Sequence, residues 1–171
     1  ILTPIPTSAD WAVQKLIQLW QAAKAEVICM DVEKHDEVLA HTSHLPHLMA
    51  FNLVEQLANR QDNLDIFRYA AGGFRDFSRI AASDPQMWHD IFFANKKAIL
   101  NAVDGFEAQL QILRKLIQDE DSHALMGLLG HAQAARQHFN HMLAKKPLME
   151  KNKVTQQFTI QPGVKSFQGK F

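Results

Sequence analysis

The sequence of 171 residues has little cysteine, no long apolar run and no excess of charge. Its single cysteine, Cys29, cannot form a disulfide within the chain, which fits a reducing cytoplasm. No apolar run approaches the roughly 20 residues that a membrane-spanning helix needs, and the start lacks the basic region and cleavage site of a signal peptide. We therefore expect a cytoplasmic chain without a membrane partner.

Charge excludes a further class of partner. The chain has 18 Lys and Arg and 18 Asp and Glu, so its formal net charge is zero. A nucleic-acid-binding domain usually shows a basic excess, so no nucleic-acid partner is expected. Apolar residues make up 47% of the chain, which at this length is enough to bury the core of one domain.

The first 30 residues predict the edge of an α/β domain. The stretch "ILTPIP" does not begin with Met and is typical of a short strand stopped by Pro4 and Pro6. Thr7 and Asp10 in "TSAD" match a capping box, and the apolar spacing after it predicts a helix over about 8–24. "AEVICM" predicts a second strand, which completes a strand, helix, strand order.

Residues 31–145 predict helices throughout. Pro46 should break or kink the first of them near Ser43, and the paired glycines at 72–73 are a stop signal for another. Ser83 or Asp84 should cap a helix that has Pro85 in its first turn. The expected segments are 31–58 with its break, one that ends at the glycine pair, 73–82, one from Pro85, 96–118 and 121–143, the last two as an antiparallel hairpin.

The composition changes after Pro147. Residues 146–157 are polar and predict a linker. Residues 158–171, "FTIQPGVKSFQGKF", alternate apolar and polar side chains around a Pro-Gly turn, which is typical of a hairpin. Fourteen residues are too few for a domain, so this segment is expected to be the start of a truncated one.

Nine histidines raise the question of a metal site. Four of them are clustered: His35, His41, His44 and His47. A helical spacing of three can bring imidazoles together around a metal, but Pro46 disrupts the turn that would align them and no Cys accompanies them. We assign no metal, and the alternative is that these histidines are hydrogen-bonded at a helix interface.

The stretch "GGFRDFSR" places charges among apolar residues. Gly72 and Gly73 do not follow a strand, so they do not match a dinucleotide-binding loop. A helix N-terminus with Arg75 one turn on can bind a carboxylate, because the free amides and the planar guanidinium both suit an anion. Asp76 and Arg79 are three apart and can pair. The alternative is an internal salt bridge that holds two helices together.

Three motifs resemble, in order and spacing, one enzyme family. "HDEVLAHTSHLPHLMA", "AAGGFRDFSRIAASDPQMWHDIFFAN" and the hairpin after them are similar to the C-terminal helical domain of prephenate and cyclohexadienyl dehydrogenases, over about 1–145. "ILTP" matches the last strand of that family's nucleotide-binding domain. The resemblance implies a mostly α fold: a helical substrate-binding and dimerisation bundle at 31–145, preceded at 1–30 by the last edge of a Rossmann domain.

The resemblance also implies roles for particular residues. The arginine at Arg79 would bind a carboxylate of prephenate, and Asp76 would belong to an ionic network around it. His44 and His47 would border the substrate cleft, and Trp88 would reach into the partner subunit's site. The expected substrate-binding set is Ser43, His44, His47, Gly72, Arg75, Asp76, Arg79 and Trp88.

The implied reaction is the NAD- or NADP-dependent oxidative decarboxylation of prephenate, or of arogenate, which from prephenate gives 4-hydroxyphenylpyruvate in tyrosine biosynthesis. The catalytic histidine and the cofactor loop are expected upstream of Ile1, so no catalytic or cofactor-binding residue is assigned here. A homodimer is expected through 96–143, because these segments carry more apolar residues than one helix pair can cover. The tail resembles the start of 5-enolpyruvylshikimate-3-phosphate synthase (3-phosphoshikimate 1-carboxyvinyltransferase), which implies a bifunctional parent.

Two other function classes stay open. A non-catalytic binding or regulatory module could retain the same helical bundle. A helical metal-dependent enzyme that uses the clustered histidines is the more distant alternative.

Overall fold

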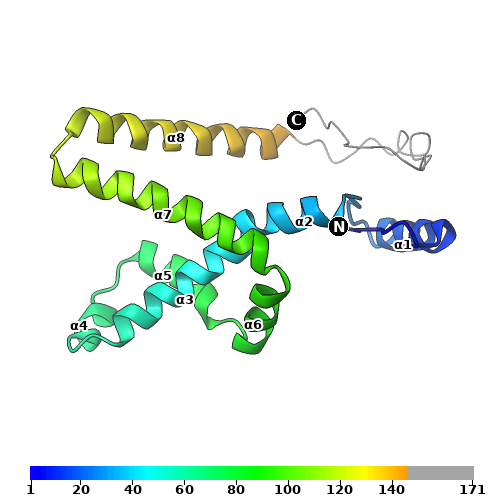
Figure 1. Cartoon of the computed structure of the whole chain (residues 1–171), viewed down its shortest axis with the longest axis horizontal. Helices are drawn as coiled ribbons and strands as arrows, with labels where there is room; N and C mark the ends of the chain where they lie inside the picture. The colour runs from blue at the N-terminus through cyan, green and yellow to red at the C-terminus, as the bar shows by residue number, and fades with distance from the viewer. Residues whose placement is uncertain (146–171) are drawn as a thin grey trace. The chain divides into compact units, whose positions relative to one another are not determined.

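The computed structural model describes residues 1–145, and the linker predicted at 146–157 and the hairpin predicted at 158–171 lie outside the described residues. The described part is helical (Figure 1). Its elements are α1 (Asp10–Ala22), α2 (Val32–Leu39), the π-helical turn η1 (Ala40–His44), α3 (Leu45–Ala58), α4 (Asn63–Arg68), α5 (Gly72–Ser78), the 3₁₀ turn η2 (Arg79–Ala82), α6 (Pro85–Ala94), α7 (Lys96–Gln118) and α8 (Ser122–Lys145).

The strand, helix, strand edge predicted for residues 1–30 is confirmed only in its helix. In place of the strands there is one parallel bridge between Leu2 and Cys29. Leu2 N donates to the Ile28 carbonyl at 2.8 Å, and Met30 N donates to the Leu2 carbonyl at 3.1 Å. Neither segment becomes a strand within the described residues, because an isolated pair of short strands is marginal without further strands beside it.

The capping box predicted for α1 is wrong. The helix begins after Ala9, and no side chain caps it. The Ser8 hydroxyl instead accepts a hydrogen bond from Ile5 N at 3.0 Å, inside the turn that precedes the helix. The turn between Ile5 and Ser8 delays the helix, so Thr7 lies two residues before the N-cap position and cannot cap it.

Pro46 changes the helix near Ser43, as predicted, but does not end it. The chain runs from α2 through the π-helical turn η1 directly into α3, with the proline in the first turn of α3. Proline has no N–H to bond the carbonyl four residues earlier, and its ring crowds that carbonyl. A π turn bonds five residues apart, so it absorbs this defect without breaking the chain's direction.

The glycine pair was predicted to end one helix and to precede another from 73, and only the second of these predictions is confirmed. α4 ends at Arg68, and Gly72 and Gly73 are the first two residues of α5. Neither glycine adopts the left-handed backbone that a glycine C-cap uses. The helix predicted over 73–82 is confirmed as a short α-helix that tightens into η2 at Arg79.

The start of α6 follows the prediction closely. Asp84 is its N-cap, and the Asp84 carboxylate accepts a hydrogen bond from Met87 N at 2.8 Å. Ser83, the other candidate, donates back to the Ile80 carbonyl at 2.7 Å and closes η2. Pro85 occupies the first helical position, where its missing N–H costs nothing.

The core lies where η1, α3 and α7 meet. Ala40, Leu45 and Ala102 are buried there, and partly buried apolar side chains pack against them: Met49, Ala98, Val103 and Phe106. α5 and η2 also lie against α3 (Figure 1). The π turn and α3 are thus the central elements of this region, and every predicted binding residue is on them or on a helix of the same compact unit.

Two compact units divide within α7. The first comprises residues 1–112, and the second begins at Leu113. In the second unit, Asp121 caps α8 by accepting a hydrogen bond from Ala124 N at 3.0 Å. The segments predicted at 96–118 and 121–143 are confirmed as α7 and α8, while their antiparallel pairing and the domain boundaries at 30 and 145 stay predictions.

Candidate functional site

A buried hydrogen-bonded group joins three elements of the first unit. His44, in η1, is 8% exposed, and Asn95, at the junction of α6 and α7, is 9% exposed. The Asn95 amide nitrogen donates to the Asp36 backbone carbonyl at 2.7 Å and lies 3.2 Å from His44 Nδ1. The π turn is therefore connected both to α2 before it and to a turn 51 residues later.

The surroundings of His44 lower its pKa. Burial lowers the pKa of His44 below its ordinary value of 6.5, and the nearby imidazoles of His35 and His47 lower it further. The Asp36 carboxylate opposes them, but this group accepts a hydrogen bond from His35 Nδ1 at 3.0 Å. Desolvation is the largest of these effects, so the fold lowers the pKa of His44 and favours its neutral form.

A stacked pair of rings lies beside this group. The His47 imidazole lies 3.8 Å from the Trp88 ring, centroid to centroid, at an angle of 21°. His44 meets the same indole edge-on, at 6.2 Å and 73°. His47 Nδ1 donates to the Ser43 carbonyl at 2.8 Å, which fixes the orientation of the imidazole on the indole. His44 and His47 therefore meet on one aromatic surface.

Trp88 is buried within its own subunit. It is 6% exposed, packs also against Phe92, and its indole N–H is buried without a hydrogen-bond partner among the described residues. A buried N–H without a partner is uncommon and costly. The expected role of Trp88 in the partner subunit's site stays a prediction. Within this chain the indole packs against His44 and His47, and we call these three residues the histidine cluster.

The charged residues of "GGFRDFSR" form a separate, exposed group. Arg75 and Asp76 lie on α5 and Arg79 opens η2, all with exposed side chains. The ion pair expected between Asp76 and Arg79 is not formed, since no ion pair within 4.0 Å joins them in the described part of the chain. The physical reason is that exposed ions gain little from pairing when water already solvates both.

Gly72 has an open environment. A side chain added there would meet nothing within 4 Å, so the glycine is not required by packing within this chain. Of the eight predicted binding residues, the structure brings together His44, His47, Trp88 and the Ser43 carbonyl. Gly72, Arg75, Asp76 and Arg79 lie on the segment that packs against α3. Among the described residues, no hydrogen bond, ion pair or ring contact joins this segment to His44, His47 or Trp88.

Asn95 is the residue that sequence reasoning missed. It comes at the end of α6, where an asparagine after a helix is an ordinary C-cap, and its backbone N–H donates to the Ile91 carbonyl at 3.0 Å. Nothing in the local pattern signals that its side chain turns inward to a histidine 51 positions earlier. Only a pairing across the fold could have identified it.

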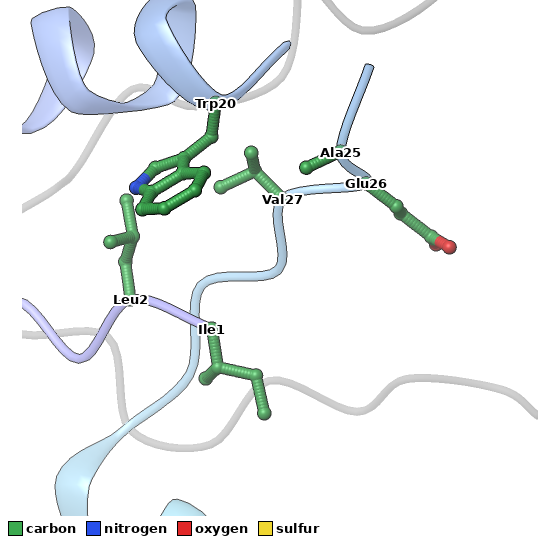
Figure 2. A pocket seen from close by; sticks show the side chains of 6 residues that line it. All are labelled: Ile1, Leu2, Trp20, Ala25, Glu26 and Val27. Carbon is green, nitrogen blue, oxygen red and sulfur yellow. The ribbon is translucent and has the colours of Figure 1, made fainter. Parts of the chain in front are cut away.

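No other chemistry stands out in the described residues. Within them no three His, Cys, Asp or Glu side chains are grouped to hold a metal ion, and no helix there is long and apolar enough to cross a membrane. A small hollow lies at the N-terminal bridge, lined by Ile1, Leu2, Trp20, Ala25, Glu26 and Val27 (Figure 2). None of the predicted site residues lines it.

Comparisons with known proteins agree on one family. The family described as "Prephenate dehydrogenase, dimerization domain" matches residues 31–131. Cyclohexadienyl dehydrogenase of Zymomonas mobilis is 38% identical over 138 residues, which are 80% of this chain and 47% of that protein. Prephenate dehydrogenase of Bacillus subtilis is 39% identical over 127 residues, 73% of this chain and 34% of that protein.

A solved structure has the same fold. Prephenate dehydrogenase from Aquifex aeolicus, crystallised with hydroxyphenyl propionate and NAD⁺, matches with a TM-score of 0.74 and 38% identity, over 80% of this chain and 48% of that one. This chain therefore spans about half the length of that relative, or less of others. On its sequence and its fold together, the chain belongs to the prephenate dehydrogenase family, of which it carries the dimerization domain.

Proposed function

We propose that this chain is the substrate-binding and dimerisation part of an enzyme that oxidatively decarboxylates prephenate, or the related amino acid arogenate, with NAD or NADP. The observation that carries the proposal is the state of Arg79. Its guanidinium is exposed, has no carboxylate partner among the described residues, and lies on η2 against α3, the helix that carries His47.

Such an arginine suits a dicarboxylate. An unpaired guanidinium keeps its whole planar fork available, and a carboxylate can occupy it with two parallel hydrogen bonds. Arg75, one turn earlier and also exposed, adds a second cation that favours a doubly charged ligand. The carboxylate of Asp76 then partly offsets the positive charge of the two arginines. The sequence alone had suggested that Asp76 pairs directly with Arg79.

The histidine cluster supports the same assignment from another side. A ring-shaped substrate needs an apolar surface and a few polar contacts, and His44, His47 and Trp88 provide aromatic surface and ring nitrogens together. The Aquifex relative was crystallised with hydroxyphenyl propionate, a ring that bears a short carboxylate chain. We infer that this chain binds a molecule of that class.

The nucleotide belongs elsewhere in a longer protein. In such an enzyme a nicotinamide would supply the hydride acceptor, and residues other than those described here would hold it. Residues 1–145 contain no strand followed by a glycine-rich turn and a helix, so these residues do not fit a dinucleotide. The resemblance of 158–171 to the start of the synthase stays a prediction, since that segment lies outside the described residues and outside the family match.

Replacement of Arg79 in the whole enzyme tests this function. For Arg79→Ala we expect catalytic efficiency with prephenate to fall roughly a hundredfold, since loss of a charge-assisted contact typically costs about 2 to 5 kcal/mol. The change should appear mainly in KM, with an unaltered melting temperature. Arg68→Ala is the matched control, because Arg68 is also an exposed arginine of this unit and its guanidinium lies over the ring of its neighbour Tyr69.

Opposite results would reject the assignment. An unchanged KM for prephenate together with a sharply lowered melting temperature would mean that Arg79 serves only the fold. Equal effects of Arg79→Ala and Arg68→Ala would mean that exposed charge in general, and not a particular site, governs substrate binding. A whole protein whose wild type does not convert prephenate or arogenate would favour the non-catalytic module.

A further inference from the structure

We propose that Asn95 is a positioning residue that holds the His44 imidazole in its Nε2–H tautomer, so that this ring offers a hydrogen-bond donor and not an acceptor at its free end. The proposal rests on one side-chain amide that faces two acceptors. These are the Asp36 backbone carbonyl, at 2.7 Å, and His44 Nδ1, at 3.2 Å.

The Asp36 carbonyl determines which way the amide faces. A backbone carbonyl oxygen can only accept, so the Asn95 atom at 2.7 Å from it must be the nitrogen, because two oxygens at that distance would repel each other. The same nitrogen lies 3.2 Å from His44 Nδ1. An amide nitrogen donates through its two hydrogens and does not accept, so Nδ1 must be the acceptor.

Asn95 is itself held from both sides. Its backbone N–H donates to the Ile91 carbonyl at 3.0 Å, and its carbonyl accepts from Ile99 N at 3.1 Å. Its side chain is buried, and the Asp36 carbonyl that receives its amide also accepts from Ala40 N at the end of α2. The junction of α6 and α7 therefore fixes the Asn95 backbone, and the Asp36 carbonyl holds the side-chain amide in place.

The charges around His44 agree with a neutral ring. The titratable groups that face it are His35 and Asp36 of α2 and His47 of α3, and burial outweighs the one acidic group among them in lowering the pKa of His44. A neutral imidazole carries one hydrogen. With Nδ1 occupied as an acceptor, that hydrogen is on Nε2.

The free end of the ring remains accessible. Nε2 of His44 has no hydrogen-bond partner in the described part of the chain, and it is not among the fully buried atoms without a partner, a class that there contains only Trp88 Nε1. It therefore keeps contact with solvent. A donor at this position favours an oxygen acceptor, such as a carboxylate, carbonyl or hydroxyl, and disfavours an ammonium group or another N–H donor.

The state of the tautomer can be measured without substrate. In the whole protein labelled with ¹⁵N at the histidine rings, we expect the His44 signals, identified by their loss in His44→Gln, to have a pyridine-like Nδ1 and a pyrrole-like Nε2. Asn95→Asp replaces the donor with an acceptor of the same shape. This variant should move the hydrogen to Nδ1 and shift the titration of His44 towards higher pH. Asn101→Asp, an exposed position on α7, adds the same charge and should change neither.

The results separate positioning from a structural role. A wild-type His44 with its hydrogen on Nδ1 would overturn the proposal, and this measurement needs only His44→Gln, to assign the signals. Asn95→Asp that lowers the melting temperature but leaves the His44 signals and titration unchanged would overturn it as well. The tautomer does not depend on the proposed function, so failure of the Arg79 test would leave it standing; only the identity of the oxygen acceptor as a substrate atom rests on that function.

Discussion

The histidine cluster of the first unit and the long helix α8 use their side chains in opposite ways. Around η1, polar groups such as His44 and Asn95 are buried and hydrogen-bonded within the chain. Along α8, in residues 122–142, no side chain is buried, and large apolar groups are exposed: Met126, Leu129, Phe139 and Met142. The region around η1 buries polar groups and gives them hydrogen bonds, while α8 exposes large apolar groups to solvent.

The difference indicates where each region gains its stability. The contacts that orient His44 and His47 all come from the same chain. A helix of 24 residues with exposed Leu, Met and Phe leaves apolar surface uncovered, and such surfaces usually mark an interface. The family match names a dimerization domain, and we propose that α7 and α8 supply the homodimer contact.

A charge on α8 gives the largest expected effect. Leu129→Glu should shift the protein towards the monomer, because a buried leucine contributes about 1.5 to 3 kcal/mol and occurs twice in a two-fold interface, so the dimer should weaken roughly a hundredfold to ten-thousandfold. Light scattering or sedimentation over a range of concentrations measures this change.

His131→Glu is the matched control for the α8 variant. His131 is also exposed and lies two residues on, hence on the opposite side of the helix, so the same charge there should leave the dimer intact. A wild-type protein that sediments as a monomer at micromolar concentration would contradict the proposal that the exposed apolar side chains of α8 form an interface.

Replacement of Trp88 should have a smaller effect on free energy than disruption of the dimer. Its effect should be on the stability of the single subunit. Trp88→Ala removes a ring that is 6% exposed and should lower the free energy of unfolding by about 3 to 5 kcal/mol. Trp11→Ala in α1 is the control, since Trp11 is 67% exposed and its removal should change stability by about 0.5 kcal/mol or less. Urea unfolding followed by circular dichroism measures both.

The two tryptophans also test the expected role of Trp88 in the partner subunit. If Trp88 served mainly a neighbouring site, Trp88→Ala would lower catalytic efficiency while its unfolding curve stayed close to that of Trp11→Ala. That result would place the ring outside the histidine cluster in the working enzyme. A large loss of stability would instead agree with the cluster described here.

The smallest expected effect is a pH dependence of stability. Because the pKa of His44 is lower when folded than its ordinary value of 6.5, the unfolded chain binds a proton in that window while the folded chain does not. The free energy of unfolding should therefore fall as pH falls through the window below about 6.5, by at most about 1.4 kcal/mol per pH unit for one proton.

Melting temperatures between pH values above and below that window measure this dependence. His44→Gln should flatten the curve there, and His123→Gln, an exposed histidine of α8, should not. Identical slopes of melting temperature against pH for the wild type and His44→Gln would show that the fold does not lower the pKa of His44. The buried and exposed regions would then not differ in how they affect protonation.

The same contrast explains which elements could be predicted. The bounds of α7 follow from a long, regular spacing of apolar residues, and the cap at Asp84 and the change near Pro46 follow from backbone chemistry that is local to those residues. The glycine pair was wrongly assigned as the end of the preceding helix, because the same residue can stop a helix or begin one, depending on its φ. The predicted strands became one bridge, because strand pairing depends on neighbours and not on the segment alone.

By itself the sequence determined which residues are available for chemistry and, through the motifs from His35 to Trp88, the family to which they belong. It could not determine how they meet. His44 and Asn95 are 51 residues apart, and Asn95 reaches the Asp36 carbonyl across 59. Only the tertiary structure showed that these groups meet, that Asp76 and Arg79 do not form the expected ion pair, and that Trp88 is buried beside two imidazoles. The physical reason is that hydrogen bonding and burial act between atoms that are close in space, whereas helix spacing and caps act between residues that are close in the chain.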